Sequence, residues 1–294
     1  MRYCLITLFV LCFGWTVYAQ SYDSFVRERP YKGRVMVCNL DTYQYINGRA
    51  VFTVRETVVM DENDKVVQKQ EWHLSPADTL VCTGHINYSY DDEDREIEQR
   101  GFYLDSENGD VYSFVMKTTE YSPNTITITE FDSDGEMIDK TILYFEDNLL
   151  VKEVSESFLG KIRTATYKNG KLQTTEEGDQ RVVYSYDKEG REDRTTEYLN
   201  GKERLRHEYN YTDGQIYDVL YYEDSLWSAY IYDCDSHDLL ARYSWSWEAE
   251  KWEVEQRNEY EYDIHGNCIS NYTFEKGGGN KPISAKISTY IYYE

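Results

Sequence analysis

Apolar and polar side chains alternate along short segments of this chain. Leu205, Tyr209 and Tyr211 occupy every second position around His207, and Tyr243 to Trp247 places serines between aromatic rings. A period of two puts such side chains on one face of a β-strand. Turn signals recur about every ten to eighteen residues from Tyr45 onwards, which leaves almost no room for helices. We therefore predict an all-β fold, a long antiparallel meander of tandem β-hairpins in a twisted or curled single sheet.

One turn motif has an aromatic residue, then Asp, two variable residues and Gly. Two weaker copies, which begin at Met60-Asp61 and Tyr90-Asp91, have Asp in place of the Gly. Asp is among the few residues besides Gly that tolerate left-handed backbone, and Asp at the first position with Gly at the fourth is typical of type I turns. The pattern therefore predicts turns. The three full copies contain Asp132 and Gly135, Asp187 and Gly190, and Asp263 and Gly266.

A shorter class of turn centres on Asn-Gly, Asp-Gly or a looser equivalent, the strongest short hairpin signal. A two-residue turn fixes the register of its hairpin, so the aromatic residue before each turn should pair with the residue five positions later. The predicted pairs are Tyr45–Ala50, Phe145–Leu150, Tyr167–Leu172, Tyr198–Glu203, Tyr211–Ile216 and Tyr222–Trp227.

Residues 1–19 have the pattern of a secretory signal peptide. Arg2 precedes an apolar run from Tyr3 to Trp15, and Val17 and Ala19 are the small residues that a cleavage site needs. No later segment is apolar for long enough to form a transmembrane helix. We expect cleavage after Ala19 and a single exported β-hairpin repeat domain at 20–294, with a possible boundary near residue 121, where the turns become more regular.

Charge and aromatic content narrow the class of protein. The chain carries a net charge of −23, and loss of Arg2, the one charged side chain of the leader, leaves −24. Such a surface repels nucleic acid. The 30 Tyr, 10 Phe and 6 Trp are far from the composition of a disordered chain. The acidity therefore favours a soluble folded protein whose partners are divalent cations or basic surfaces.

Three segments carry a family resemblance. The stretches Tyr260–Asp263, Tyr184–Asp187 and Tyr230–Asp233 resemble the tyrosine-aspartate (YD, RHS-like) repeats of exported bacterial proteins. The leader resembles those of secreted Bacteroidota proteins, many from families of unknown function. In the repeat family, hairpins form a long coiling sheet that sometimes closes into a shell around a toxin. This chain is far shorter and has no toxin segment, so the resemblance implies only a β-repeat scaffold that binds carbohydrate or protein at the Gram-negative cell envelope.

An outer-membrane barrel needs an outward apolar face on every strand. The stretch Arg191 to Glu197 has no such face on either side. We therefore expect no membrane-spanning barrel, only a sheet that curls to bury its aromatic face.

Four cysteines follow the leader, and an even count in an exported protein favours disulfides. Cys38–Cys82 with Cys234–Cys268 is the pairing with the shorter loops, although three pairings are open. Cys82 and His85 also have a spacing compatible with metal binding, but no further zinc ligands can be identified. A disulfide cysteine beside an ordinary histidine is the preferred interpretation.

The sequence contains no catalytic frame. It has no Gly-x-Ser-x-Gly elbow, no His-Glu-x-x-His and no phosphate loop. We interpret His207 as a packed face position and His265 as an exposed turn residue. No cofactor is expected apart from calcium, for which several acidic loops supply oxygen ligands without matching an EF-hand. The calcium candidates are Asp91, Asp92, Asp94, Asp105 and Asp110.

The best candidate for binding is an aromatic row. Tyr243, Trp245 and Trp247 fall on one face of one strand, and Trp252 lies just beyond the next turn. Exposed flat rings in a row suit stacking on sugar rings, whereas the same row could instead form the core. We expect a non-enzymatic binding or structural protein of the cell envelope. The alternative is a secreted hydrolase, such as a glycosidase with two carboxylates.

Overall fold

The computed structural model describes residues 32–75, 77–104, 110–235, 238–276 and 279–293. Every regular element in these ranges is a β-strand. No helical segment with the length and apolarity of a membrane span occurs in this part of the chain. The predicted leader and its cleavage site lie outside the described residues.

Twenty strands follow one another along the chain. The first ten are β1 Val35–Ile46, β2 Arg49–Met60, β3 Val66–Leu74, β4 Leu80–Tyr90, β5 Glu96–Leu104, β6 Val111–Ser122, β7 Thr125–Phe131, β8 Met137–Glu146, β9 Leu149–Ser157 and β10 Ile162–Lys168. The second ten are β11 Lys171–Glu177, β12 Gln180–Tyr186, β13 Glu192–Leu199, β14 Lys202–Thr212, β15 Gln215–Tyr222, β16 Ser225–Cys234, β17 Leu239–Ser246, β18 Lys251–Tyr262, β19 Cys268–Glu275 and β20 Ser284–Tyr292.

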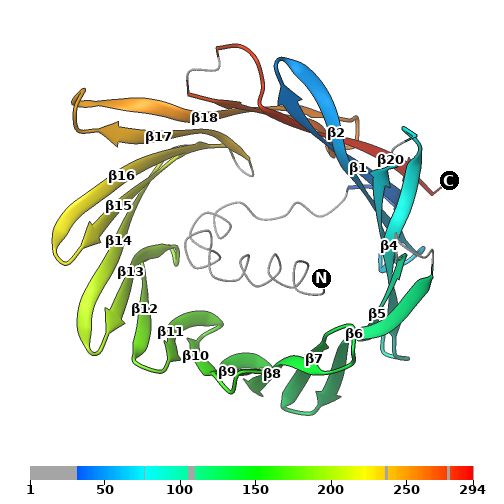
Figure 1. The fold of residues 1–294 in the computed structure, drawn as a ribbon. Helices are drawn as coiled ribbons and strands as arrows, with labels where there is room; N and C mark the ends of the chain where they lie inside the picture. Colours follow the sequence, from blue (N-terminus) through cyan, green and yellow to red (C-terminus); the bar gives the residue numbers. More distant parts are fainter. Residues whose placement is uncertain (1–31, 76, 105–109, 236–237, 277–278, 294) are drawn as a thin grey trace, which may run out of the picture.

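Each strand pairs antiparallel with the next, and the last strand pairs with the first. The ladder between β1 and β20 runs from Val35↔Tyr292 to Gln44↔Ser284. The fold is therefore a closed antiparallel barrel (Figure 1). The expected open or curled single sheet was wrong, because β1 and β20 each complete the other's hydrogen bonds and leave no edge strand.

Strand number explains why the sheet closes. A strongly twisted open sheet of more than about ten strands curls or splits. Twenty strands spaced about 4.8 Å apart and tilted by about 40° give a barrel about 40 Å across between opposite backbones. Inward side chains are too short to fill such a width, so the wall encloses a lumen instead of a packed core.

The wall is polar on both faces around Arg191 to Glu197, the stretch that led us to expect no membrane-spanning barrel. On one face of β13, Arg194 lies 3.4 Å from Glu208 of β14. On the other face, Glu197 lies 3.8 Å from Arg204. A wall without an apolar face does not form a lipid-facing band, but the sheet can still close into a barrel. The expectation of an open sheet did not separate these two questions.

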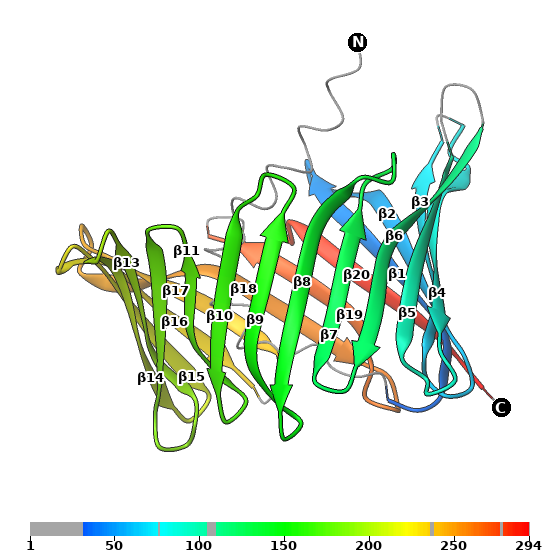
Figure 2. The same cartoon turned by 90° about the horizontal axis from the view of Figure 1, so that it is seen from below.

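The up-and-down course places the turns alternately at the two ends of the barrel (Figure 2). Turns from even to odd strands, such as β2–β3 and β4–β5, lie at one end with the start of β1 and the end of β20. We call it the tyrosine end. Turns from odd to even strands, from β1–β2 to β19–β20, lie at the other end. We call it the tryptophan end, because Trp72, Trp227, Trp245, Trp247 and Trp252 all lie close to its turns.

The aspartate turns share one geometry. In the turn after β18, Asp263 Oδ1 accepts hydrogen bonds from the amides of His265 and Asn267, at 2.9 and 2.8 Å. Gly266 has a φ of 84° and donates its amide to the Asp263 carbonyl. The same left-handed backbone occurs at Asp64 (φ 61°) and Asp94 (φ 66°) in the copies without glycine. Tolerance of this backbone explains the exchange of Gly for Asp.

The short hairpins fix register as their turn residues predict. Five of the six expected cross-strand pairs are confirmed, namely Tyr45↔Ala50, Phe145↔Leu150, Tyr167↔Leu172, Tyr198↔Glu203 and Tyr211↔Ile216. The sixth was wrong, because the positive-φ residues of that turn are Glu223 and Asp224. Tyr222 therefore pairs with Ser225, although its ring still lies 5.8 Å from that of Trp227.

Tyrosine hydroxyls cap the strands at the tyrosine end. The Tyr90 hydroxyl donates a 2.7 Å hydrogen bond to the carbonyl of Val66, the first residue of the neighbouring strand. A basic side chain from an adjacent turn often lies over the same ring, as Arg95 does over Tyr121 at 4.5 Å. The equivalent bonds run from Tyr121 to Glu96, Tyr186 to Leu172, Tyr211 to Glu192, Tyr260 to Leu239 and Tyr290 to Cys268.

Candidate functional site

The predicted aromatic row forms a cluster on the β17–β18 hairpin, at the tryptophan end. Trp245 pairs directly with Trp252 across the hairpin, and Tyr243 pairs with Val254. The Trp245 ring lies 6.2 Å from that of Trp247 and 5.4 Å from that of Trp252. The structure thus brings the three tryptophans into ring contact, with Tyr243 two residues before Trp245 on the same strand. We call these four residues, Tyr243, Trp245, Trp247 and Trp252, the tryptophan cluster.

Solvent reaches this cluster. Trp247 is 56% exposed and Trp252 is 37% exposed, whereas Tyr243 and Trp245 are half-buried beneath them. A core position would hide all four rings, so the row does not serve as a core.

The rings are not parallel, contrary to the flat row that alternation suggested. Trp245 stands at 75° to Trp247 and at 73° to Trp252. Trp247 lies beyond Ser246, the last paired residue of β17, so it is not held in the ladder as Trp245 is. The cluster therefore offers separate ring faces and edges, supported from below by Trp245.

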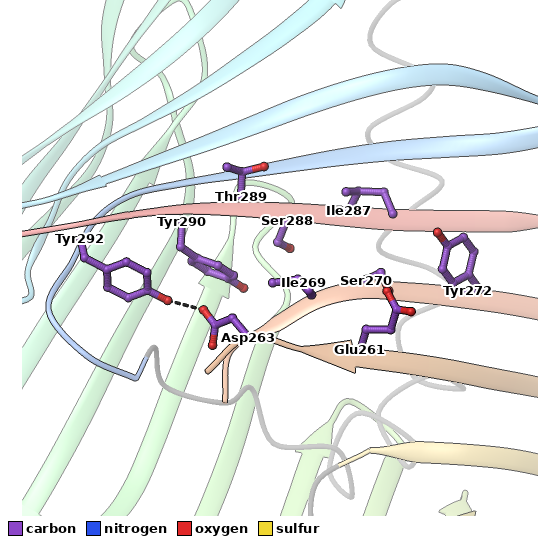
Figure 3. Close-up of a pocket in the computed structure, with 10 residues that line it drawn as sticks. All are labelled: Glu261, Asp263, Ile269, Ser270, Tyr272, Ile287, Ser288, Thr289, Tyr290 and Tyr292. Atoms are coloured by element: carbon purple, nitrogen blue, oxygen red, sulfur yellow. Dashed lines mark hydrogen bonds between the residues drawn. The ribbon is translucent and has the colours of Figure 1, made fainter. Parts of the chain in front are cut away.

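A pocket of about 460 Å³ opens beside the tyrosine end, where β19 and β20 separate (Figure 3). The two strands pair only from Ser270↔Ile287 to Thr273↔Ser284, so Ser288 to Tyr292 extend past the last pair. Side chains bridge the gap in place of backbone bonds. Tyr290 donates to the Cys268 carbonyl at 2.8 Å, and Tyr292 donates to the Asp263 carboxylate.

The acidic residues of this pocket hold structure together. Glu261 accepts a 2.8 Å hydrogen bond from the Ser270 hydroxyl. Burial alone would raise the pKa of Asp263, but hydrogen bonds from Tyr292 and from main-chain amides outweigh it and keep the pKa below its ordinary value. A general acid for glycoside cleavage needs the opposite shift. Asp263, held by these hydrogen bonds, is therefore not suited to the role of that acid.

Another group of titratable side chains lies in the wall formed by β13, β14 and β15. His207 Nδ1 lies 2.9 Å from Asp218 Oδ1, and Asp218 is buried. Burial raises the pKa of the nearby Glu192 carboxyl, although Thr195 and His207 oppose the shift. His207 does occupy a packed face, but its buried aspartate partner was missed. The turn at Asp213-Gly214 contains that signal, because its register sets Tyr209 opposite Asp218 and so places His207 beside them.

Two of the acidic calcium candidates form ion pairs with basic side chains. Asp91 pairs with Arg95 at 2.7 Å, and this contact lowers the pKa of Asp91. Asp94 pairs with Lys65 from the neighbouring turn. Asp92 is exposed, Asp110 directly precedes β6, and Asp105 is outside the described residues. Within the described ranges, no group of three or more His, Cys, Asp or Glu side chains could hold a metal ion.

The expected disulfides are not formed. Cys38 lies in β1 and Cys82 in β4, with two strands between them, and Cys234 and Cys268 are likewise separated by two strands. Three strand spacings are about 14 Å, well beyond the reach of a disulfide. The preference for shorter loops failed because closeness along the chain was taken for closeness in the sheet. His85 stacks on Phe102 at 4.6 Å, and the exposed ring of His265 contacts Tyr292 at 4.4 Å.

Comparisons with known proteins found no matching family model and no matching curated protein. Among solved structures, a porin-like protein from Bacteroides uniformis is similar at 12% identity and a TM-score of 0.42, over 89% of this chain and 99% of that one. A porin-like protein from Bacteroides vulgatus is similar at 9% identity and a TM-score of 0.24, over 87% of this chain and 98% of that one. The structure of TcdB2-TccC3-Cdc42 is similar at 11% identity and a TM-score of 0.27, over 78% of this chain but 16% of that one.

Proposed function

We propose that this protein is an exported, non-enzymatic binding module of the cell envelope, and that its tryptophan cluster binds carbohydrate. The observation that carries the proposal is the exposure of Trp247 and Trp252 above the half-buried Trp245. Large apolar rings left in solvent beside one another mark a binding surface more often than an accident of folding. Indole faces stack on the C–H faces of sugars, and the indole N–H donates to hydroxyl groups.

The barrel gives this cluster a rigid support. β17 pairs with β16 on one side and with β18 on the other, and β18 in turn pairs with β19. A ligand therefore meets rings whose positions are set before binding, which lowers the entropy cost of association. The net charge of −23 further favours neutral over acidic sugars as ligands.

The non-enzymatic part of the proposal is supported by the state of the acidic groups. In the pocket between β19 and β20, Asp263 accepts hydrogen bonds from the amides of its own turn, and Glu261 accepts one from Ser270. Asp218 is paired with His207. The pKa of Asp263 is lowered, the opposite of the shift that the acid of a hydrolase needs, and Asp218 is buried.

The test is a glycan array probed with purified residues 20–294, using neutral and acidic oligosaccharides. The variants Trp247→Ala and Trp252→Ala are each compared with Trp227→Ala, which removes an exposed tryptophan from another hairpin at the same end. We expect binding to neutral sugars that falls at least tenfold in the first two variants and is kept in the third. A folded protein that binds no sugar, or that binds equally after Trp247→Ala, would overturn the proposal.

A chelator arm tests calcium separately. Arg95 and Lys65 occupy Asp91 and Asp94, so we expect the same sugars to be bound with calcium and with chelator. Binding that disappears in chelator would instead assign a metal to the recognition site.

A further inference from the structure

The exposed large apolar side chains of the barrel gather at the tryptophan end. Eighteen of them lie near its turns, namely Ile46, Val51, Leu74, Tyr103, Leu104, Val111, Tyr112, Met137, Ile138, Phe158, Leu159, Ile162, Leu199, Leu226, Trp227, Trp247, Trp252 and Val254. Six lie near the tyrosine end, namely Ile97, Leu149, Leu240, Tyr262, Ile264 and Ile291. These counts cover the described residues.

Several turns of this end carry exposed apolar side chains in the turn itself or in the strand residues beside it, and we call these groups the apolar tips. The β9–β10 turn presents Phe158 and Leu159, which are 64% and 67% exposed. Val111 begins β6 and Trp227 follows the β15–β16 turn, and both are 66% exposed. Loop tips are normally polar because exposed apolar groups cost solvation free energy. Their repetition on successive hairpins points to a surface that is covered in use.

The arrangement is a ring. The turns from β1–β2 to β17–β18 succeed one another around the barrel (Figures 1 and 2). Exposed apolar residues lie in or beside each of these turns except β11–β12. Apolar groups spread around one whole end of the barrel need a covering partner that is broad, unlike a single peptide or a small molecule.

Charge and shape favour a lipid bilayer over a second copy of this chain as the partner. A second copy stacked end to end would add another charge of −23 and would oppose acidic turns such as Asp132–Glu136. In such a stack the separate tips of one barrel would meet those of the other, and rigid groups in contact only at their tips pack poorly. A fluid bilayer of uncharged net surface has neither problem, since lipids rearrange around each tip. Tryptophan and tyrosine are, in addition, the residues that favour the membrane–water interface.

We propose that the tryptophan end docks on the surface of a neutral phospholipid bilayer, with the apolar hairpin tips inserted among the headgroups and the barrel standing outside the hydrocarbon core. The strands do not cross the bilayer, because the polar pairs Arg194–Glu208 and Glu197–Arg204 occupy opposite faces of the wall. Affinity comes from apolar area and is opposed by negative lipid charge.

The experiment is flotation of the full exported chain with phosphatidylcholine vesicles. Phe158→Asp/Leu159→Asp places two charges on one tip of the ring, and Leu149→Asp/Ile264→Asp places two charges on exposed apolar residues of the tyrosine end. We expect the bound fraction of wild type and of the second variant to be alike, and the partition coefficient of the first variant to fall at least about tenfold. Equal binding by the two variants, or no flotation of the wild type, would overturn the proposal.

Lipid charge and the oligomeric state of the protein are measured separately. Replacing part of the phosphatidylcholine with phosphatidylglycerol should weaken flotation at low salt, and added salt should restore it. Light scattering without lipid should give a monomer, whereas a dimer lost in Phe158→Asp/Leu159→Asp would assign the ring to a second copy and overturn lipid docking. The β9–β10 tip is remote from β17–β18 along the ring, so this variant should retain sugar binding even if docking fails.

Discussion

The phenolic hydroxyl of Tyr90 donates a 2.7 Å hydrogen bond to the main-chain carbonyl oxygen of Val66. Val66 is the first residue of β3, and its carbonyl lies where the β3–β4 ladder has ended. The bond therefore replaces a missing backbone partner with a side chain. Lys65 lies over the same ring at 5.3 Å, so one tyrosine joins two neighbouring turns of the tyrosine end.

Removing one such hydroxyl should destabilise the barrel modestly. For Tyr90→Phe and Tyr186→Phe we expect a loss of about 1–2 kcal/mol in the free energy of unfolding, because each leaves a carbonyl without its donor while the ring packing stays. Tyr198→Phe, on β13 at the tryptophan end, is the control and should change stability by less than about 0.5 kcal/mol. The midpoint of urea denaturation, with an unchanged slope, measures each effect. Equal losses in all three variants would contradict the capping role.

The aspartate turns should make stability fall in acid. The pKa of Asp91 is lowered first by the Arg95 side chain, and the pKa of Asp61 is lowered first by the Lys65 amide. A lowered folded pKa gives a contribution that is fully present above the unfolded value of about 3.9 and is lost as the pH falls through the folded value. The free energy of unfolding of Asp61→Asn and of Asp91→Asn should therefore be lower than that of wild type at pH 6 and should approach it near pH 2. Denaturation at a series of pH values checks this, and parallel curves would argue against it.

The pair of His207 and Asp218 should contribute more to the free energy of unfolding than an exposed pair of the same type. Asp218 is 2% exposed, so His207→Ala would leave a buried charge without this partner, at a cost of about 3 kcal/mol. His73 and Glu71 also lie 2.6 Å apart, but both side chains are largely exposed. His73→Ala should cost at most about 1 kcal/mol. Thermal and urea unfolding of the two variants measure the difference, and similar losses would show that burial of Asp218 is of little consequence.

Local structure could be predicted from the sequence because its signals are local. Asn47-Gly48 fixes Tyr45 opposite Ala50 through backbone conformation alone, without help from the rest of the chain. The alternation of Tyr243 and Trp245 likewise places both on one face, and their exposure could not be read from it because serines suit either environment.

Closure and the candidate sites depend on contacts that no local signal reports. The pairing of Val35 with Tyr292 joins the two ends of the described chain, and no turn residue specifies it. The Cys38–Cys82 expectation failed for the same reason, since loop length says nothing about how many strands lie between two residues. The ring of apolar tips could be recognised only after the alternation of turns between the two barrel ends was known.

Asn267 should control the closure of the barrel. Its side chain accepts from the Lys32 amide and donates to the Lys32 carbonyl, both at 2.7 Å, and it also donates to the Tyr292 hydroxyl at 2.8 Å. One buried amide thus ties the entry to β1, the β18–β19 turn and the end of β20 together. Asn267→Ala removes these bonds, and we expect a loss of about 2–4 kcal/mol.

Hydrogen exchange should locate this effect. The amides of β1 and β20 should exchange faster in Asn267→Ala, while those of β8, on the far side of the barrel, keep their protection relative to global unfolding. Asn271→Ala is the matched control, because Asn271 lies in β19, which begins directly after Asn267, but pairs with Lys286 inside the β19–β20 ladder. If β1 and β20 stay protected in Asn267→Ala, the ladder between them closes the barrel without this amide, and Asn267 serves only its own turn.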